Sequence, residues 1–325
     1  MTVSIIIPIH NGVDFVRRSL ASAEQAGSAV GQNYEILLVD DASTDGSVAA
    51  AQRYIRQSGA TISILTSPRR GAPAARNYGV EHSSGRWLQF LDVDDTLAPD
   101  KIAHQLQLAG ADQQWVVGAY HNLYVDGSTK EEQPHDDLWR GLFFQFRTGH
   151  TISNLVRRDA LVKIGGWNEA LANNQDPDLA FRLLRAAVPY VLDRDAKSFY
   201  HHHPSPSRIT SSDAAGRLQN RMLLLVEASV FLQNARPTYW QENKSYLLGA
   251  LLRTIRLAAT YDLEAATRHY ATLFGPQGPY DHSADLELLS RYTRLYPYLG
   301  FKNLERLRLA LAGIFPPALK RLAKR

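Results

Sequence analysis

Three carboxylates lie within four residues, at Asp92, Asp94 and Asp95, directly after an apolar run from Trp87 to Leu91 that predicts a buried strand. Like charges this close repel one another, so a fold usually gathers them where a cation binds. Two kinds of chemistry use such a group. The carboxylates could hold a divalent metal against a nucleotide diphosphate, or Asp92 could be the nucleophile of a phosphotransferase.

Strands that alternate with helices must position these carboxylates. Apolar, β-rich runs predict strands at Val3–Ile9, Glu35–Val39, Ile62–Leu65 and Arg86–Leu91, and helical spacing predicts helices at Val13–Ala26, Ser47–Gln57, Pro73–His82 and Pro99–Leu108. The alternation is typical of βαβ units around a mostly parallel sheet, where ligands bind beyond the carboxyl ends of the strands. Asp40-Asp41 and Asp92 both follow such strands, so we expect them to share one crevice.

The pattern changes in the second half of the chain. Short strands and loops are expected from Trp115 to His150, then a helix at Asp176–Ala187 and a return to the sheet at Val191–Tyr200. Helical periodicity dominates afterwards, in Arg217–Asn234, Tyr239–Thr260 and three later segments. We therefore predict an α/β domain over residues 1–212 and a helical C-terminal extension over residues 213–325.

Composition narrows the class of protein. Of the 325 residues, 45% are hydrophobic and 21% are charged, which is typical of a globular protein with a substantial core. The net charge of +4 suits phosphate ligands but is too small to indicate nucleic-acid binding. Cysteine is absent, which excludes disulfides and thiolate chemistry. Met1–Pro8 has no basic n-region and no apolar run reaches about 18 residues, so we expect a cytoplasmic protein without a transmembrane helix.

Six motifs, in their order and spacing, resemble those of family 2 glycosyltransferases. They are Val3–Gly12, Leu37–Ser47, Gly71–Gly79, Phe90–Asp95, Gly165–Glu169 and Gln175–Arg182, within roughly residues 1–210. The resemblance implies the GT-A fold, a Rossmann-like, mostly parallel sheet flanked by helices. It also implies an inverting transfer of a sugar from a nucleotide-diphosphate donor, with a UDP-sugar favoured. The acceptor would be a hydroxyl of a saccharide, a lipid-linked glycan or a protein-linked glycan.

The resemblance implies a nucleotide site at the strand ends. Its nucleotide-binding residues would be Pro8, His10, Asn11, Asp41, Arg76 and Asp92. The Asp41 carboxylate can accept a hydrogen bond from the imide of a pyrimidine base, although the turn-rich segment around it also fits a plain Asx turn. Arg76 would approach the nucleotide, or it could be a solvated charge on its helix.

A divalent metal, Mn²⁺ or Mg²⁺, is implied as well. Asp94 would be a direct ligand, Asp92 would bind the ribose or the metal shell, and His203 would approach from the Tyr200–Pro204 segment. Oxygen ligands suit these ions, and a metal on the diphosphate neutralises the leaving group. A solvated acidic loop and an exposed histidine loop are the plainer alternatives.

Asp176 corresponds to the family's catalytic base, which takes the proton from the acceptor hydroxyl as it attacks the anomeric carbon. The family usually has Glu-Asp here, whereas this chain has Gln175-Asp176. Asp176 followed by Pro177 also fits a helix N-cap, and both roles are compatible because the helix dipole favours an anion. Gln175 and Trp167 would contact the acceptor, with core packing the alternative for Trp167.

Three other functions compete for these residues. Asp92 to Leu97 fits the first motif of haloacid-dehalogenase-like phosphatases, but three predicted strands precede it, whereas that motif normally follows the first strand. A dinucleotide-binding oxidoreductase is disfavoured because Pro8–Gly12 lacks the Gly-x-Gly-x-x-Gly pattern. A catalytically inactive GT-A module that binds carbohydrate or scaffolds an assembly stays open because of Gln175.

The C-terminal segment is basic and amphipathic. Apolar residues recur at helical spacing among basic ones, with Glu305 as the one acidic residue: Leu304, Leu307, Leu311 and Ile314, and Arg306, Arg308, Lys320, Arg321, Lys324 and Arg325. Such a segment can lie peripherally on an anionic membrane, in this case the inner face of the cell membrane. Alternatively, its apolar stripe packs on the catalytic domain or on the second subunit of a homodimer.

Overall fold

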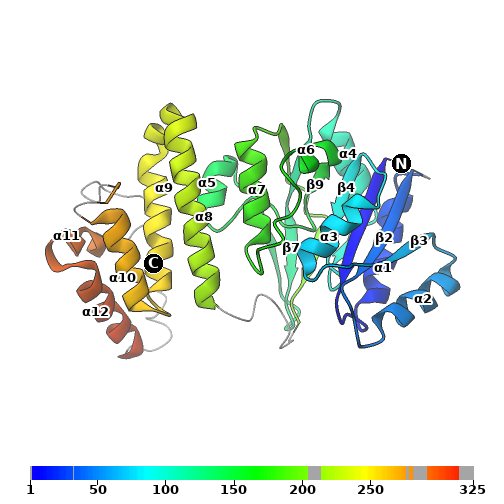
Figure 1. The fold of residues 1–325 in the computed structure, drawn as a ribbon, viewed down its shortest axis with the longest axis horizontal. Helices are drawn as coiled ribbons and strands as arrows, with labels where there is room; N and C mark the ends of the chain where they lie inside the picture. Colours follow the sequence, from blue (N-terminus) through cyan, green and yellow to red (C-terminus); the bar gives the residue numbers. More distant parts are fainter. Residues whose placement is uncertain (1, 32, 204–213, 276–277, 281–290, 315–325) are drawn as a thin grey trace. The chain divides into compact units, whose positions relative to one another are not determined.

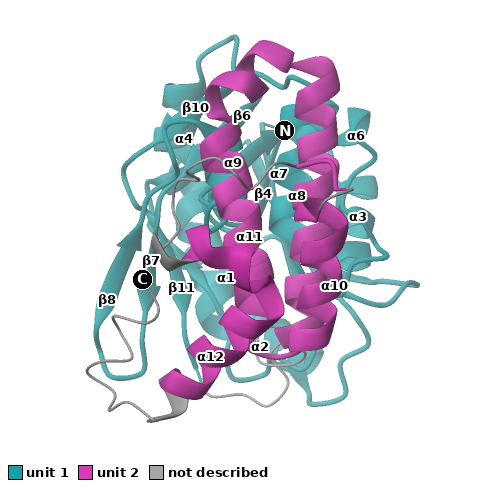
Figure 2. Ribbon diagram, turned by 90° about the vertical axis from the view of Figure 1, so that its left-hand side faces the viewer, with its two compact units in different colours: residues 1–205 teal, residues 206–325 magenta. Residues whose placement is uncertain are grey.

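A computed structural model describes residues 2–31, 33–203, 214–275, 278–280 and 291–314 (Figure 1). The chain forms two compact units, Met1–Ser205 and Pro206–Arg325 (Figure 2). The domain boundary predicted after residue 212 lies among residues 204–213, outside the described residues.

The first unit is built around a seven-stranded sheet. In spatial order its strands are β10 (Tyr190–Asp193), β6 (Trp115–Gly118), β9 (Leu155–Arg157), β4 (Trp87–Phe90), β1 (Val3–Ile9), β2 (Tyr34–Asp40) and β3 (Ile62–Thr66). β1 pairs in parallel with β2 and β4, so that Val3 lies opposite Tyr34 on one side and Trp87 on the other. β9 runs antiparallel to β4 and β6. The predicted mostly parallel sheet is confirmed.

Helices connect the strands as the alternation predicts. They are α1 (Val16–Ser28), α2 (Ser47–Ser58), α3 (Ala72–Glu81), α4 (Lys101–Ala109), α5 (Leu138–Phe143), α6 (Arg158–Lys163) and α7 (Gln175–Arg185). A smaller sheet has the order β5 (Thr96–Leu97), β11 (Ser198–His201), β7 (Tyr120–Leu123) and β8 (Thr129–Glu132). Of these short strands, β7 and β8 lie in the irregular stretch of sequence predicted after Trp115.

The return to the sheet predicted for Val191–Tyr200 is found, but the segment is divided between two sheets. The segment forms β10 in the large sheet and β11 in the small one. The Asp193 carboxylate accepts a hydrogen bond from the Asp195 backbone N–H at 3.0 Å, which turns the chain between the two strands. The segment therefore connects the two sheets of the first unit.

The central strand β1 is buried along its whole length, because helices cover both faces of the sheet. Gly79 on α3 allows one of these helices to approach closely. A Cβ atom there would lie 2.5 Å from Cγ2 of Ile6 and 3.2 Å from Cγ2 of Val39, so a larger residue would push α3 outwards. The glycine thus holds α3 against the sheet and fixes the position of Arg76, one turn earlier on the same helix.

The described part of the second unit is helical, as predicted. Its elements are α8 (Ala214–Ala235), α9 (Pro237–Ala258), α10 (Leu263–Phe274), the 3₁₀-helix η1 (Arg291–Leu295), α11 (Tyr296–Leu299) and α12 (Phe301–Ile314). No helix among the described residues of the chain is long and apolar enough to span a membrane.

Helix α12 does not present the uniform amphipathic face that its sequence predicts. Glu305 is fully buried, where its carboxylate accepts hydrogen bonds from Arg256 at 3.3 Å and Arg308 at 2.6 Å. Leu304 is 7% exposed, whereas Leu307 and Leu311 are 54% and 41% exposed. Within the described residues, packing therefore accounts for Leu304 alone among these three leucines. Residues 315–325 of the predicted basic end lie outside the described residues.

Candidate active site

Asp41 stands at the carboxyl end of β2 and offers an unsatisfied acceptor. The residue is 9% exposed, and its Oδ2 accepts a hydrogen bond from the Gly71 backbone N–H at 2.9 Å. Its Oδ1 is buried and has no hydrogen-bond partner among the described residues. Buried acceptors are normally satisfied, so this oxygen indicates a place for a donor from a ligand. Among the described residues Asp41 makes no Asx turn; its neighbour Asp40 accepts from the Ser43 N–H at 3.1 Å and so holds the turn-rich segment.

The loops that follow β1 and β2 are bound to each other. His10 Nδ1 lies 2.6 Å from the backbone oxygen of Asp41. Asn11, in a left-handed conformation, accepts a hydrogen bond from the Thr44 N–H at 2.8 Å. Pro8 is buried within β1. The structure thus brings His10 against Asp41 and Asn11 against the loop that follows it, both exposed at the surface, whereas Pro8 lies within the strand.

Arg76 is a buried bridge between two motifs. It is 4% exposed, which makes its interpretation as a solvated helix charge wrong. Its Nη2 donates to Asp92 Oδ1 at 2.6 Å and its Nη1 donates to Gln175 Oε1 at 2.8 Å. The guanidinium carbon also lies 4.6 Å from the ring centroid of Trp167, within the range of a cation–π contact. One side chain therefore joins the acidic motif after β4 to the residue that precedes Asp176.

Gln175 and Trp167 contact protein groups. The Gln175 amide nitrogen donates to the backbone oxygens of Leu171 at 3.1 Å and Ala172 at 3.4 Å. Trp167 is 2% exposed and its ring meets Phe90 edge-on, with 5.2 Å between centroids. Both residues hold Arg76 in place, and their predicted contact with an acceptor stays a prediction.

The loop that carries Trp167 is fastened by Asn77, a residue for which no role was predicted. The Asn77 amide nitrogen donates to the Trp167 backbone oxygen at 2.9 Å and to Glu169 Oε1 at 2.8 Å. The Asn77 amide oxygen accepts from the Trp167 backbone N–H at 2.8 Å. Asn77 follows Arg76 directly on α3, so the helix positions both the guanidinium and the ring beneath it.

The three carboxylates after β4 avoid mutual repulsion because each faces a different partner. Asp92 accepts from Arg76, as described above. Asp94 Oδ2 lies 2.8 Å from His203 Nε2, and Asp95, which is fully buried, accepts from the His201 backbone N–H at 2.8 Å. The interpretation of the cluster as a solvated acidic loop is therefore wrong for Asp95.

The three consecutive histidines also have separate partners. The rings of His201 and His202 lie 2.9 Å from Thr96 Oγ1 and 2.8 Å from Asn122 Oδ1, whereas the ring of His203 faces Asp94 of the acidic cluster. Burial, followed by the charge of Arg18, lowers the pKa of His201 to about 4, so its imidazole is neutral near pH 7.

Asp94 and His203 fit a metal that a nucleotide would complete. Within the described part of the chain, no three His, Asp or Glu side chains form a cluster that could hold a metal by themselves. Mg²⁺ sites on nucleotides usually take one or two carboxylates and obtain the remaining ligands from phosphates and water. A carboxylate oxygen and an imidazole nitrogen that face each other at 2.8 Å are suitable donors for such an ion.

Asp176 lies inside the first turn of α7. The helix begins at Gln175 with Asn174 as its N-cap residue, so the interpretation of Asp176 as the N-cap is wrong. The Thr151 hydroxyl donates a hydrogen bond to Asp176 Oδ1. Both residues line a cavity of about 20 Å³ together with Trp167. Thr151 has no distinctive sequence motif around it, and only the fold shows that it orients the carboxylate.

Comparison with solved structures identifies the class of this fold. The structure of S. aureus TarS residues 1–349 in complex with UDP-GlcNAc matches with a TM-score of 0.58 at 13% identity, covering 84% of this chain and 86% of that one. The mannosyltransferase PcManGT from Pyrobaculum calidifontis, in complex with GDP-Man and Mn²⁺, matches with a TM-score of 0.53 at 15% identity, covering 96% and 87%. The chain has the GT-A fold of glycosyltransferases.

Sequence comparison gives the family. Residues 4–165 match the family model described as Glycosyl transferase family 2. The putative glycosyltransferase EpsH of Bacillus subtilis is 25% identical over 256 residues, which is 74% of this chain and 70% of EpsH. The amylovoran biosynthesis glycosyltransferase AmsB of Erwinia amylovora is 25% identical over 214 residues, 61% of this chain and 69% of AmsB. The chain belongs to glycosyltransferase family 2.

Some relatives are much longer. An uncharacterized glycosyltransferase of Rickettsia felis is 29% identical over 227 residues, which is 64% of this chain but 36% of that protein. The chain likewise spans 36% and 60% of the glycosyltransferases RC0461 of Rickettsia conorii and RT0329 of Rickettsia typhi.

The GT-A fold and the family also exclude the phosphatase and the oxidoreductase as interpretations of the acidic motif.

Proposed function

We propose that the chain is an inverting, metal-dependent glycosyltransferase that moves a sugar from a nucleotide-diphosphate donor to an acceptor hydroxyl. The observation that carries the proposal is the Arg76 bridge. It joins Asp92, in the donor motif, to Gln175, the neighbour of the candidate base Asp176, through hydrogen bonds of 2.6 and 2.8 Å. The residues proposed to bind the donor and to accept the proton are thereby held in one rigid arrangement.

The donor nucleotide is proposed to be a uridine diphosphate. Asp41 Oδ1 has no hydrogen-bond partner among the described residues, while Oδ2 accepts from the Gly71 N–H. The uracil imide presents one N–H donor, which suits one available oxygen. Guanine would present two adjacent donors to a carboxylate, of which one oxygen is already engaged. PcManGT was solved with GDP-Man, so the base is a point for direct test.

In the proposed transfer step, the residues near Gln175 act on the acceptor and the residues near Asp92 act on the donor. Asp176 accepts the proton of the acceptor hydroxyl as its oxygen attacks the anomeric carbon and the bond to the diphosphate breaks. Thr151 fixes Asp176 Oδ1 and so directs Oδ2 towards the acceptor. Asp94 and His203 would hold Mn²⁺ or Mg²⁺, which when bound offsets the charge of the leaving diphosphate. Attack from the face opposite the leaving group inverts the configuration.

The acceptor is proposed to be a hydroxyl of a glycan, a lipid-linked saccharide or a protein-linked saccharide. AmsB is named for amylovoran biosynthesis, which favours a role in building a polysaccharide. The proposed location is the cytoplasm, with peripheral contact at the inner face of the membrane as the further alternative. The basic C-terminal end supports that contact, and a homodimer is the competing explanation for its apolar residues.

Donor hydrolysis tests the function without a known acceptor. Purified protein is incubated with Mn²⁺ and, in separate reactions, UDP-glucose, UDP-GlcNAc, UDP-galactose and GDP-mannose, and the released nucleotide is measured. We expect release from at least one UDP-sugar. In Asp176→Asn, we expect donor affinity within a few-fold of wild type and turnover lower by roughly 10²-fold, the usual scale for loss of a general base. Asp112→Asn, at an exposed aspartate after α4, is the matched control.

The result also separates an enzyme from an inactive module. A catalytically inactive GT-A module would bind UDP and Mn²⁺ by calorimetry and release no nucleotide from any donor. Turnover in Asp176→Asn equal to that of wild type would show that Asp176 is not the base. Release from GDP-mannose alone would overturn the choice of uridine while retaining the reaction.

A further inference from the structure

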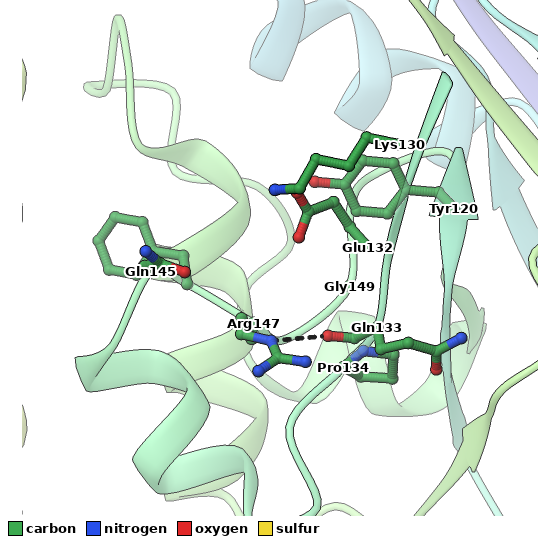
Figure 3. Close-up of a pocket in the computed structure, with 9 residues that line it drawn as sticks. Tyr120, Lys130, Glu132, Gln133, Pro134, Gln145, Arg147 and Gly149 are labelled. Atoms are coloured by element: carbon green, nitrogen blue, oxygen red, sulfur yellow. Dashed lines mark hydrogen bonds and ion pairs between the residues drawn. The ribbon is translucent and has the colours of Figure 1, made fainter. Parts of the chain in front are cut away.

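A second, larger cavity lies in the first unit, away from Trp167 and Gln175. Its volume is about 240 Å³, room for roughly one sugar unit, and its lining is mainly polar. Figure 3 shows Tyr120, Lys130 and Glu132 on the strands at one side and Gln145 on the loop at the other. Nothing in the donor chemistry uses these residues.

The register of the β7–β8 hairpin builds one wall of this cavity. Tyr120 lies directly opposite Glu132, and Asn122 lies opposite Lys130. Because side chains alternate along a strand, these four residues share one face of the hairpin. That face carries an aromatic ring, a carboxylate and an ammonium group, which is the mixture of groups that binds a saccharide through its hydroxyls and its apolar ring face.

Arg147 supplies the other wall from a constrained loop. Gln145 and Phe146 have φ values of 60° and 52°, a left-handed conformation that residues with a side chain rarely adopt. Gly149 closes the loop at φ 75°, where a Cβ atom would lie 2.0 Å from Asn154 Oδ1. The loop is thus held in a conformation that aims Arg147 at the cavity, as strained segments at binding sites often do.

The guanidinium of Arg147 is available to a ligand. Its Nε donates to the Gln133 backbone oxygen at 2.9 Å, and the described residues give its two terminal nitrogens no hydrogen-bond partner. The positive charge of Lys130 is balanced by the carboxylate of Glu132, with which it forms an ion pair. The cavity therefore carries one net positive charge, at a planar donor that suits the two oxygens of a carboxylate or a phosphate.

The cavity adjoins the candidate base. Gly149 lines it and Thr151, two residues further along the chain, donates its hydroxyl to Asp176. Two residues span at most about 7 Å between Cα atoms. The ring of His150 lies between those of Tyr120 and Tyr200, with centroids 5.4 and 4.9 Å away. Burial, then the charges of Glu132 and Asp176, raise the pKa of the Tyr120 hydroxyl.

We propose that this cavity is the acceptor subsite and that it takes an anionic saccharide, whose carboxylate or phosphate binds Arg147 and whose sugar ring rests against Tyr120 and Glu132. The inference rests on the proposed glycosyltransferase function. It moves the acceptor contact from Trp167 and Gln175, where the sequence places it, to the β7–β8 hairpin and the loop that carries Arg147.

Four probes test the chemistry by titration in saturation-transfer NMR: methyl glucuronide, glucose 6-phosphate, methyl glucoside and inorganic phosphate. In wild type we expect at least one anionic sugar to bind about tenfold more tightly than methyl glucoside, in line with a charge-assisted, bidentate contact. The two anionic sugars distinguish a carboxylate from a phosphate. Arg147→Gln should abolish the preference and Arg147→Lys should restore part of it. Arg56→Gln, at an exposed arginine near the end of α2, should retain it.

Several results would overturn the subsite. They are equal binding of methyl glucoside and both anionic sugars to wild type, an unchanged preference in Arg147→Gln, or inorganic phosphate as tight as glucose 6-phosphate, since that would remove the role of the sugar. The comparison of anionic with neutral sugars on the wild-type protein tests the subsite even where a variant fails to fold. Donor hydrolysis by wild type is measured separately, so a protein that binds the probes but hydrolyses no donor would refute the proposed function and leave the binding site.

Discussion

Asp92 and Asp94 are two carboxylates with the same exposure and different expected costs of removal. Their side chains are 25% and 24% exposed. Asp92 is the counter-charge of Arg76, whose side chain is 5% exposed, whereas Asp94 faces His203, an imidazole that carries charge only when protonated. Replacing each by alanine therefore compares the loss of a buried ion pair with the loss of a hydrogen bond at equal exposure.

The magnitudes follow from what each partner retains. Without Asp92, the guanidinium of Arg76 keeps only Gln175 and the ring of Trp167 among the partners seen here, and Arg76 Nε already has none among the described residues. Removing one member of a buried pair costs about 3–5 kcal/mol, which partial exposure of Asp92 reduces to roughly 2–3 kcal/mol. Asp94→Ala should cost about 1 kcal/mol or less. In a unit of this size the first change lowers Tm by about 5–10 °C.

Thermal unfolding without nucleotide or metal, followed by circular dichroism, measures the difference. The double variant Arg76→Met/Asp92→Ala is the internal control, because it removes the buried charge together with its partner. It should unfold at a higher temperature than Asp92→Ala alone. Equal destabilisation by Asp92→Ala and Asp94→Ala, or no recovery in the double variant, would refute the Arg76 bridge as the reason for the burial of this cluster.

Three further outcomes are expected. Asp94→Ala should lose Mn²⁺-dependent binding of UDP in calorimetry while keeping its fold; binding equal to wild type would contradict the metal assignment. Burial lowers the pKa of Lys101 to about 7, so unfolding takes up a proton between pH 7 and about 10, and the stability of the wild type rises with pH over that range. Lys101→Met removes this dependence. Its free energy of unfolding relative to wild type, measured in urea, should therefore be about 2 kcal/mol higher at pH 6 than at pH 9. A chain ending at Ile314, which keeps Glu305, should sediment less with anionic liposomes than the full chain at low salt, with each lost basic residue worth about 1 kcal/mol; equal sedimentation would eliminate the tail as an anchor.

Local sequence signals were sufficient for strands β1 to β4 and for helices α1 to α4. The strand β1 is apolar throughout because it is buried on both faces, so periodicity and composition predict it to the residue. The division of Val191–Tyr200 between two sheets was not predicted, because it depends on the Asp193 carboxylate accepting a hydrogen bond from the Asp195 backbone. Nothing in the apolar pattern distinguishes one strand with a polar interruption from two strands in different sheets.

The candidate site was predictable in its residue types and less so in its partners. The carboxylates at the ends of β2 and β4 follow from the rule that ligands bind beyond the carboxyl ends of parallel strands. The burial of Arg76 did not follow, because an arginine on an amphipathic helix looks alike whether it faces water or two acceptors from distant segments. Thr151 was missed for the same reason: its contact with Asp176 joins positions 25 residues apart.

The replacement of the family's usual glutamate by Gln175 is the feature that most favours an inactive module, and the structure gives it another explanation. A glutamate here would give Arg76 a second carboxylate, but it could not donate to the backbone oxygens of Leu171 and Ala172 as the Gln175 amide does. The amide therefore serves both neighbours, accepting from the guanidinium and donating to the loop before α7. Asp176 keeps its orientation from Thr151, which does not depend on the charge at position 175. Loss of that carboxylate is consequently a change in how Arg76 is held, and by itself is no evidence against catalysis.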